Sequence, residues 1–116
     1  MFDVIEKIIT DTKQKRIKND YFGIVLNAEA VLEYLPAILN YEVDQEHQYR
    51  QFEAKLTQER DETGKLRTGA YCETHAKASQ FYAEYRKAQL FRELMYEVIN
   101  ISKKLSAGLG KEFNAQ

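Results

Sequence analysis

The chain has 116 residues, a length that suits one domain with an independent but modest hydrophobic core. Hydrophobic residues make up 44% of the sequence and charged residues 30%, a balance that argues against intrinsic disorder of the whole chain. The formal net charge of −1 lacks the basic excess that usually accompanies duplex-DNA binding. The single cysteine, Cys72, excludes an internal disulfide.

Charge is distributed unevenly along the chain. Residues 27–62 carry nine acids and three bases, whereas residues 64–116 carry nine bases and five acids. Acids interrupt the apolar stretch at the N-terminus, so it does not have the pattern of a signal peptide. No uninterrupted apolar run approaches the ~20 residues that a membrane span needs. Together with a lone thiol that fits a reducing compartment, these features predict a cytoplasmic protein without membrane contact.

The first predicted element is a helix over residues 2–17. Several bases between residues 13 and 18 suit the negative end of its dipole, and Asn19-Asp20 then breaks it. Its apolar stripe, at spacings of three and four, comprises Phe2, Ile5, Ile8 and Ile9.

Residues 21–26 are the only strand-like run in the chain, but a single strand has no partner, so a buried connector is an equal alternative. Asn27 is a good N-cap for a helix over residues 28–35. Pro36 removes a backbone donor, so it either kinks this helix or starts a new one. A further helix is predicted over residues 37–61.

Residues 62–69 form the clearest loop, and Thr68 is a plausible N-cap for the element that follows. That element is the dominant feature of the sequence, a single long helix over residues 70–106. Its apolar residues recur at spacings of three and four, and few glycines or prolines interrupt it.

The end of the chain carries signals for a helix terminus. Gly108 followed by Leu109 resembles a helix C-cap with its apolar contact. We therefore expect a single helical domain over residues 1–110 and a frayed tail over residues 111–116.

The predicted fold class is all-α. It is a small helical bundle built on a long antiparallel hairpin of residues 37–61 with residues 70–106, with one or two N-terminal helices packed on it. A turn centred at Lys65 and Leu66 places Tyr49 opposite Tyr82, and Arg50 near Glu84. Beyond the end of this pairing, the apolar stripe from Val98 to Leu105 must be covered by the first helix or by a second subunit.

His47 and His75 each resemble half of a metal-binding helix pair, because Asp44 and Cys72 precede them by three residues. In the hairpin register the two histidines lie roughly 13 Å apart along the axis, at ~1.5 Å per residue, too far for one metal ion. Cys72 with His75 also lacks a third residue to orient a nucleophile. We therefore expect no metal site, no cofactor and no catalytic residues.

Two surfaces are candidates for binding. The glycine-flanked loop before the long helix carries Lys65 and Arg67, which with Lys87 could contact an anion or a nucleic acid. The long helix also carries tyrosines interleaved with bases, a pattern typical of protein interfaces and of surfaces that stack on single-stranded nucleic acid. This second surface comprises Tyr82, Tyr85, Arg86, Arg92 and Tyr96.

The favoured function is a non-enzymatic, helical protein-interaction or adaptor module with a protein partner, which we expect to form a homo-oligomer. The alternative is a small nucleic-acid or nucleotide-binding protein that uses the basic, tyrosine-rich helix face. Small size and a helical-hairpin plan are common among accessory proteins of phages and mobile elements, although no residue-level motif carries that likeness.

Overall fold

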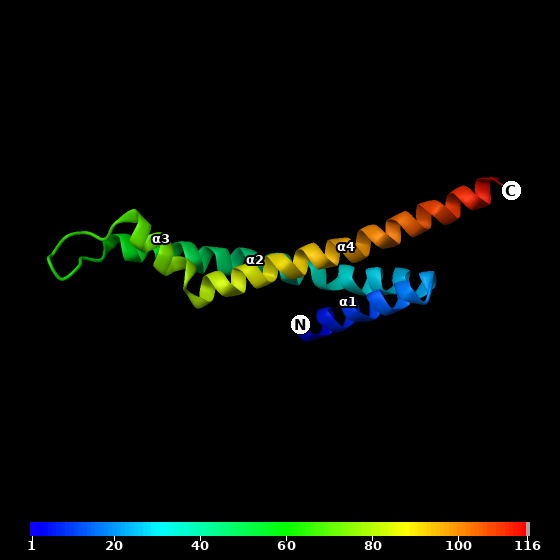
Figure 1. Cartoon of the computed structure of the whole chain (residues 1–116), viewed down its shortest axis with the longest axis horizontal. Coiled ribbons are helices and arrows are strands. Elements are labelled where there is room, and N and C mark those ends of the chain that lie inside the picture. The colour runs from blue at the N-terminus through cyan, green and yellow to red at the C-terminus, as the bar shows by residue number, and fades with distance from the viewer. Residues whose placement is uncertain (116) are drawn as a thin grey trace. The chain divides into compact units, whose positions relative to one another are not determined.

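The computed structural model describes the backbone of residues 1–115 and the side chains of residues 1–108. The predicted all-α fold is confirmed, with α2 packing against α4 and the shorter helices beside them (Figure 1). That part of the chain contains no strand, although a β-bridge joins Arg60 to Leu66 across the loop. The helices are α1 (Phe2–Ile17), α2 (Tyr21–Gln58), α3 (Gly69–Lys77) and α4 (Gln80–Ala115).

Contacts within the chain divide it into two compact units. Unit 1 combines residues 1–38 with residues 90–116, and unit 2 comprises residues 39–89. Each unit therefore takes one part of α2 and one part of α4, and each has a hydrophobic cluster of its own.

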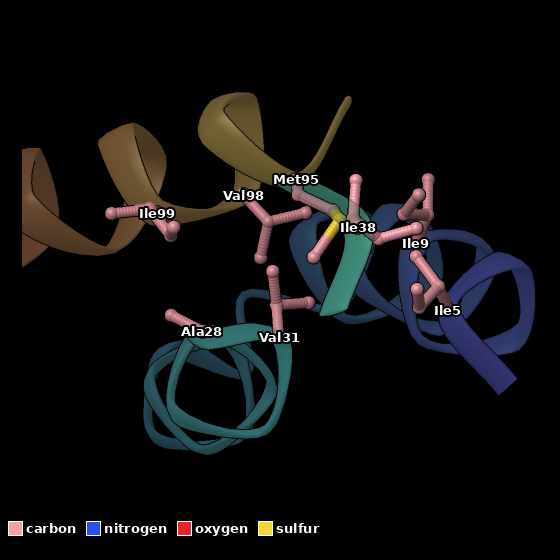
Figure 2. Packing of buried hydrophobic residues seen from close by; sticks show 8 residues of the cluster. All are labelled: Ile5, Ile9, Ala28, Val31, Ile38, Met95, Val98 and Ile99. Atoms are coloured by element: carbon pink, nitrogen blue, oxygen red, sulfur yellow. The ribbon is translucent and has the colours of Figure 1, made fainter. Parts of the chain in front are cut away.

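The core of unit 1 is built by three helices. α1 contributes two isoleucines, α2 contributes three residues on one face, and α4 contributes three more, as Figure 2 shows. The predicted apolar stripe of α1 provides its share of this core, and the T-shaped pair of Phe2 and Phe91 adds to it, with ring centroids 4.9 Å apart. The buried members are Ile5, Ile9, Ala28, Val31, Ile38, Met95, Val98 and Ile99.

The reversal between α1 and α2 is short and tightly packed. α1 ends where predicted, and Asn19 adopts a left-handed conformation with a φ of 56°. The Asp20 carboxylate accepts a hydrogen bond from the Gly23 N–H at 3.0 Å, which caps the start of α2. A Cβ on Gly23 would lie 2.5 Å from Oδ2 of Asp20 and 2.7 Å from Cδ of Lys15, so a larger residue here would require these two side chains to move.

The predicted strand or connector over residues 21–26 is wrong, because these residues form the first turns of α2. The predicted N-cap role of Asn27 is also wrong. Asn27 lies inside α2 and its amide donates to Oδ2 of Asp11 at 2.9 Å and to Oγ1 of Thr12 at 3.1 Å. A residue that suits a helix start by local propensity instead makes a polar contact between α1 and α2.

Pro36 neither ends nor restarts a helix. α2 continues through it from Tyr21 to Gln58, so the separate helices predicted over residues 28–35 and 37–61 are one. Proline removes one backbone hydrogen bond at a cost of ~3 kcal/mol or more. Pro36 is exposed, so water can reach the carbonyl that lost its donor, and Val31 and Ile38 on either side are buried in the core.

The single helix predicted over residues 70–106 is wrong, because the helix is interrupted between α3 and α4. At the break, Ser79 Oγ accepts a hydrogen bond from the Tyr82 N–H at 3.3 Å and donates one to the Ala76 carbonyl at 2.6 Å. Serine can replace helical hydrogen bonds with side-chain ones, which is why it caps α4 here.

The predicted helix end at Gly108 is wrong as well, since α4 continues to Ala115. A glycine inside an exposed helix costs only ~1 kcal/mol, which does not suffice to end it. The fraying predicted for residues 111–116 stays a prediction, and Gln116 lies outside the described residues.

The apolar stripe near the end of α4 is largely covered within the chain. Val98 is buried, and Ile101 lies with Ile9 and Thr12 of α1 around one small hollow. The sequence left two alternatives for covering this stripe, the first helix or a second subunit. In unit 1, α1 covers it.

α2 is apolar as well as long. It contains an 18-residue window with a mean hydropathy of 1.5, so by length and composition alone it could cross a membrane. Two acids, Glu29 and Glu33, lie in this apolar part, and Val31 of the same turns is fully buried in the core of unit 1. Within the structure, 28% of the window is buried.

Met95 tests the core of unit 1, because its side chain is fully buried between three helices. We expect Met95→Ala to lower the free energy of unfolding by about 2–5 kcal/mol, the usual range for such a cavity. Leu90→Ala is the matched control on the same helix, since Leu90 is 54% exposed. Urea denaturation measures both, and equal stability of Met95→Ala and the parent would contradict this core.

Candidate functional site

The core of unit 2 places α3 against the second part of α2. Thr68 Oγ1 accepts a hydrogen bond from the Tyr71 N–H at 3.1 Å, which confirms the predicted N-cap. Two small buried residues, Cys72 and Ala76, then let α3 approach Tyr49 and Leu56 of α2 closely. This packing fixes the position of Tyr49, which is only 3% exposed.

The predicted pairing of α2 with α4 is confirmed in unit 2. The rings of Tyr49 and Tyr82 have centroids 5.0 Å apart, as the hairpin register requires. Phe52, which the same register places opposite Ser79, instead pairs with Phe81, with ring centroids 6.2 Å apart. Such aromatic pairs contribute ~0.5–1.5 kcal/mol each beyond the area they bury.

An open groove of about 310 Å³ lies beside this aromatic pair, and we call it the tyrosine groove. All of its residues belong to unit 2 and come from α2, α3 and α4. They are Tyr49, Arg50, Glu53, Glu73, Lys77, Tyr82, Tyr85, Arg86 and Gln89.

Three tyrosine rings form one wall of the tyrosine groove. Tyr49 and Tyr85 are stacked, with an interplanar angle of 9° and centroids 6.3 Å apart, and Tyr82 lies beside both. Burial is the main cause that raises the pKa of Tyr49 and of Tyr85. The phenols of Tyr49 and Tyr85 therefore remain neutral at physiological pH.

The cations of the groove are partly neutralised by their own neighbours. The Arg50 guanidinium lies 4.9 Å from the Tyr49 ring centroid, and its Nη1 is 3.5 Å from Oε2 of Glu53. Lys77 Nζ donates to Oε1 of Glu73 at 2.8 Å, a contact that lowers the pKa of Glu73. Because these pairs are exposed, solvent screens them and they add little to stability.

Two polar groups of the groove retain hydrogen-bonding capacity. Glu53 Oε2 is buried and accepts no hydrogen bond from the described residues, because its 3.5 Å contact with Arg50 lacks hydrogen-bond geometry. Arg86 donates to the Gln89 side chain, whose amide in turn donates to the Tyr85 hydroxyl at 2.8 Å. A guanidinium has five N–H donors, so Arg86 can bind an acceptor in addition to Gln89.

The structure brings together three of the five residues predicted for the interaction surface. Tyr82, Tyr85 and Arg86 line the tyrosine groove, whereas Arg92 and Tyr96 belong to unit 1. The prediction missed the contributions of α2 and α3 to this groove. The hairpin register, which places Tyr49 opposite Tyr82, was the one signal that pointed to them.

Lys65 and Arg67, the loop residues predicted to contact an anion, lie in a turn whose backbone amides already bind a carboxylate of the same chain. Oδ1 of Asp61 accepts hydrogen bonds from the backbone N–H groups of Thr63 at 2.8 Å and of Lys65 at 3.0 Å. The Arg67 guanidinium stacks over the Tyr71 ring at 4.5 Å, and the Lys65 and Lys87 side chains are exposed. The loop amides that could cradle an external phosphate are therefore partly occupied.

His75 and Cys72 pack against neighbouring residues, whereas His47 is exposed. The His75 ring packs edge-on against Tyr71, with centroids 3.9 Å apart, and Cys72 is buried. Among residues that the structure describes, no group of three or more His, Cys, Asp or Glu side chains is placed to hold a metal ion.

Comparison of the chain with protein-family models, with curated proteins and with solved structures found no match. The chemistry of the described residues is therefore the basis for assigning a function.

A hydrogen bond of Tyr41 provides a pH-dependent test of the packing of α2 against α4 in unit 2. The Tyr41 hydroxyl donates to Oε2 of Glu84 at 2.6 Å, which raises the pKa of Tyr41 to about 12 from 10.0. Because the folded pKa is the higher one, the stabilisation is complete below pH 10 and is lost as pH rises towards 12. We expect Tyr41→Phe to reduce the free energy of unfolding by about 1 kcal/mol at neutral pH.

The measurement is urea denaturation of parent and Tyr41→Phe from neutral pH upwards, together with an absorbance titration of the phenolates. The difference in stability shrinks above pH 10, and the latest-titrating tyrosine is absent from the variant. Equal stability at neutral pH, or an unchanged titration, would show that this hydrogen bond does not form.

Proposed function

We propose that the chain is a non-enzymatic protein-interaction module and that its partner binds in the tyrosine groove. The observation that carries this proposal is the gathering of Tyr82, Tyr85 and Arg86 at one open groove. Tyrosine and arginine are enriched at the energetic centres of protein interfaces. Both combine a packing surface with hydrogen-bond donors, which suits a surface that is exposed before it binds.

The groove favours a particular kind of partner segment. A side chain with an apolar body packs against the edges of Tyr82 and Tyr85, while a carboxylate or carbonyl of the partner accepts from Arg86. An extended peptide segment carries both groups.

The tyrosine chemistry supports a binding role over catalysis. A general base must be deprotonated near neutral pH, yet burial moves the pKa of Tyr49 and Tyr85 upwards. Lys77 is engaged by Glu73 through a hydrogen bond that raises its pKa, which also keeps it charged and non-nucleophilic.

Nucleic-acid binding is the weaker alternative. Bases stack on open ring faces, but Tyr49 is stacked against Tyr85 and packed beside Tyr82. The groove also carries two carboxylates among its charged groups, Glu53 and Glu73, which repel phosphates. A protein partner uses the ring edges and hydroxyls that remain accessible.

A second copy of the chain is the first partner to consider. The acidic stretch over residues 27–62 and the basic stretch over residues 64–116 have opposite charge. A two-fold axis would allow each stretch to meet its opposite on the other subunit. Self-association through α4 is part of this proposal, although α1 already covers much of the apolar stripe near Val98.

Site-specific photocrosslinking in the native host tests the proposal. A benzophenone amino acid at Tyr82 retains an aromatic ring in the groove, and the same residue at exposed Ala83 is the matched control. We expect a discrete protein adduct from position 82 only, with its yield reduced ten-fold or more by Arg86→Ala, as for a central interface arginine. Because Arg86 is exposed, this second change leaves the melting temperature unaltered.

The adduct also identifies the class of partner. A product of twice the chain mass indicates a second copy, and a different protein mass indicates a heterologous partner. Adducts that nuclease removes, or equal yields from positions 82 and 83, would contradict the proposal.

A further inference from the structure

The corner between α1 and α2 exposes large apolar side chains that unit 1 does not use. Ile17, at the end of α1, is 75% exposed, and Phe22, in the first turn of α2, is 74% exposed. Tyr21 and Leu26 beside them are also exposed, whereas Ile24 in the same turns is fully buried. The exposed residues therefore extend away from the core face of α2.

Exposed cations lie at the end of α1, next to this apolar corner. Lys13, Arg16 and Lys18 make no ion pair with a carboxylate of the described side chains, although Arg16 lines a hollow with Glu93 and Glu97 of α4. Lys104 of α4 lines a hollow together with Arg16 and Tyr21. Lys15 differs, since its Nζ lies 3.5 Å from both Asp11 and Asp20.

We propose that this corner docks on the surface of an anionic lipid bilayer. Ile17 and Phe22 enter the interfacial region, while Lys13, Arg16 and Lys18 face the lipid phosphates. Exposed apolar side chains next to exposed cations are the composition that binds such surfaces. Charge complementarity favours an anionic bilayer as the partner, because its interfacial region can bury the apolar side chains while its phosphates contact the cations.

The docking is peripheral and does not require α2 to span the bilayer. Val31 and Ile38 of its apolar window are fully buried in the core of unit 1. Glu29 and Glu33 lie in the same turns, and placing carboxylates in hydrocarbon is costly. Only the corner, where α1 turns into α2, needs to reach the membrane.

A second copy of the chain is the less favourable occupant of this corner. In a two-fold contact the same patch meets itself, so the cations of one corner would face those of the other. An anionic surface removes that repulsion. The proposal is independent of the tyrosine groove, which lies in unit 2 and shares no residue with the corner.

Co-sedimentation with sucrose-loaded vesicles tests the proposal on the full chain. We expect binding to vesicles of phosphatidylcholine containing phosphatidylserine, and little binding to phosphatidylcholine alone. Each removal of a cation in Lys13→Gln, Arg16→Gln and Lys18→Gln lowers the partition coefficient about five-fold, as ~1 kcal/mol per base implies. Phe22→Ser lowers it about ten-fold or more, because an aromatic side chain leaves the interface.

Val43→Ser is the matched control, since Val43 is an exposed apolar residue of α2 outside the corner. We expect the partition coefficient of Val43→Ser to stay at the parent value. Failure of the parent to bind the anionic vesicles, or equal losses from Phe22→Ser and Val43→Ser, would overturn the proposal. So would a parent dimer that Phe22→Ser converts to a monomer in sedimentation equilibrium, because the corner would then be an interface between copies.

Discussion

The packing of Tyr49 is the contact on which the rest of unit 2 depends. Its ring lies against Tyr82 and Tyr85 of α4 on one side, and the small residues Cys72 and Ala76 of α3 complete its cluster. A single buried ring on α2 thereby connects three helices. The tyrosine groove exists because α3 ends at Lys77 and α4 begins at Gln80, which allows both helices to contact the same ring.

Unit 1 depends on a different constraint, the close approach of α1 to α2 at their reversal. Gly23 permits this approach, and the Asn27 amide joins the two helices through Asp11 and Thr12. The contact with Thr12 pairs a buried hydroxyl, which would otherwise be costly, whereas the contact with Asp11 is exposed. One consequence is that Ile17 and Phe22 remain on the outside of the reversal, where the apolar core cannot reach them.

The parts of the fold that sequence reasoning predicted rest on local signals. The bounds of α1 and the Thr68 cap follow from apolar spacing and capping chemistry, and the pairing of Tyr49 with Tyr82 follows from the loop position. Two of the errors lie where tertiary packing overrides local preference. Pro36 and Asn27 resemble helix boundaries, but buried neighbours on both sides keep α2 continuous.

The candidate site was predictable only in part for the same reason. Tyr82, Tyr85 and Arg86 lie on one helix, so their spacing in the sequence identifies them as one surface. Arg92 and Tyr96 have a similar spacing on the same helix but belong to unit 1. Glu53 and Lys77 come from other helices, and only the packing of α3 on α2 brings them to the groove. Helix periodicity carries no information about such packing.

A double-mutant cycle between Tyr49 and Tyr82 tests the central contact most directly. Tyr49→Leu and Tyr82→Leu retain apolar bulk and remove the ring pair, so each variant remains able to fold. Urea denaturation of the parent, both single variants and the double variant gives the coupling energy. The structure predicts a favourable coupling of about 0.5–1.5 kcal/mol, and strictly additive effects would contradict the packing of α2 against α4 that creates the tyrosine groove.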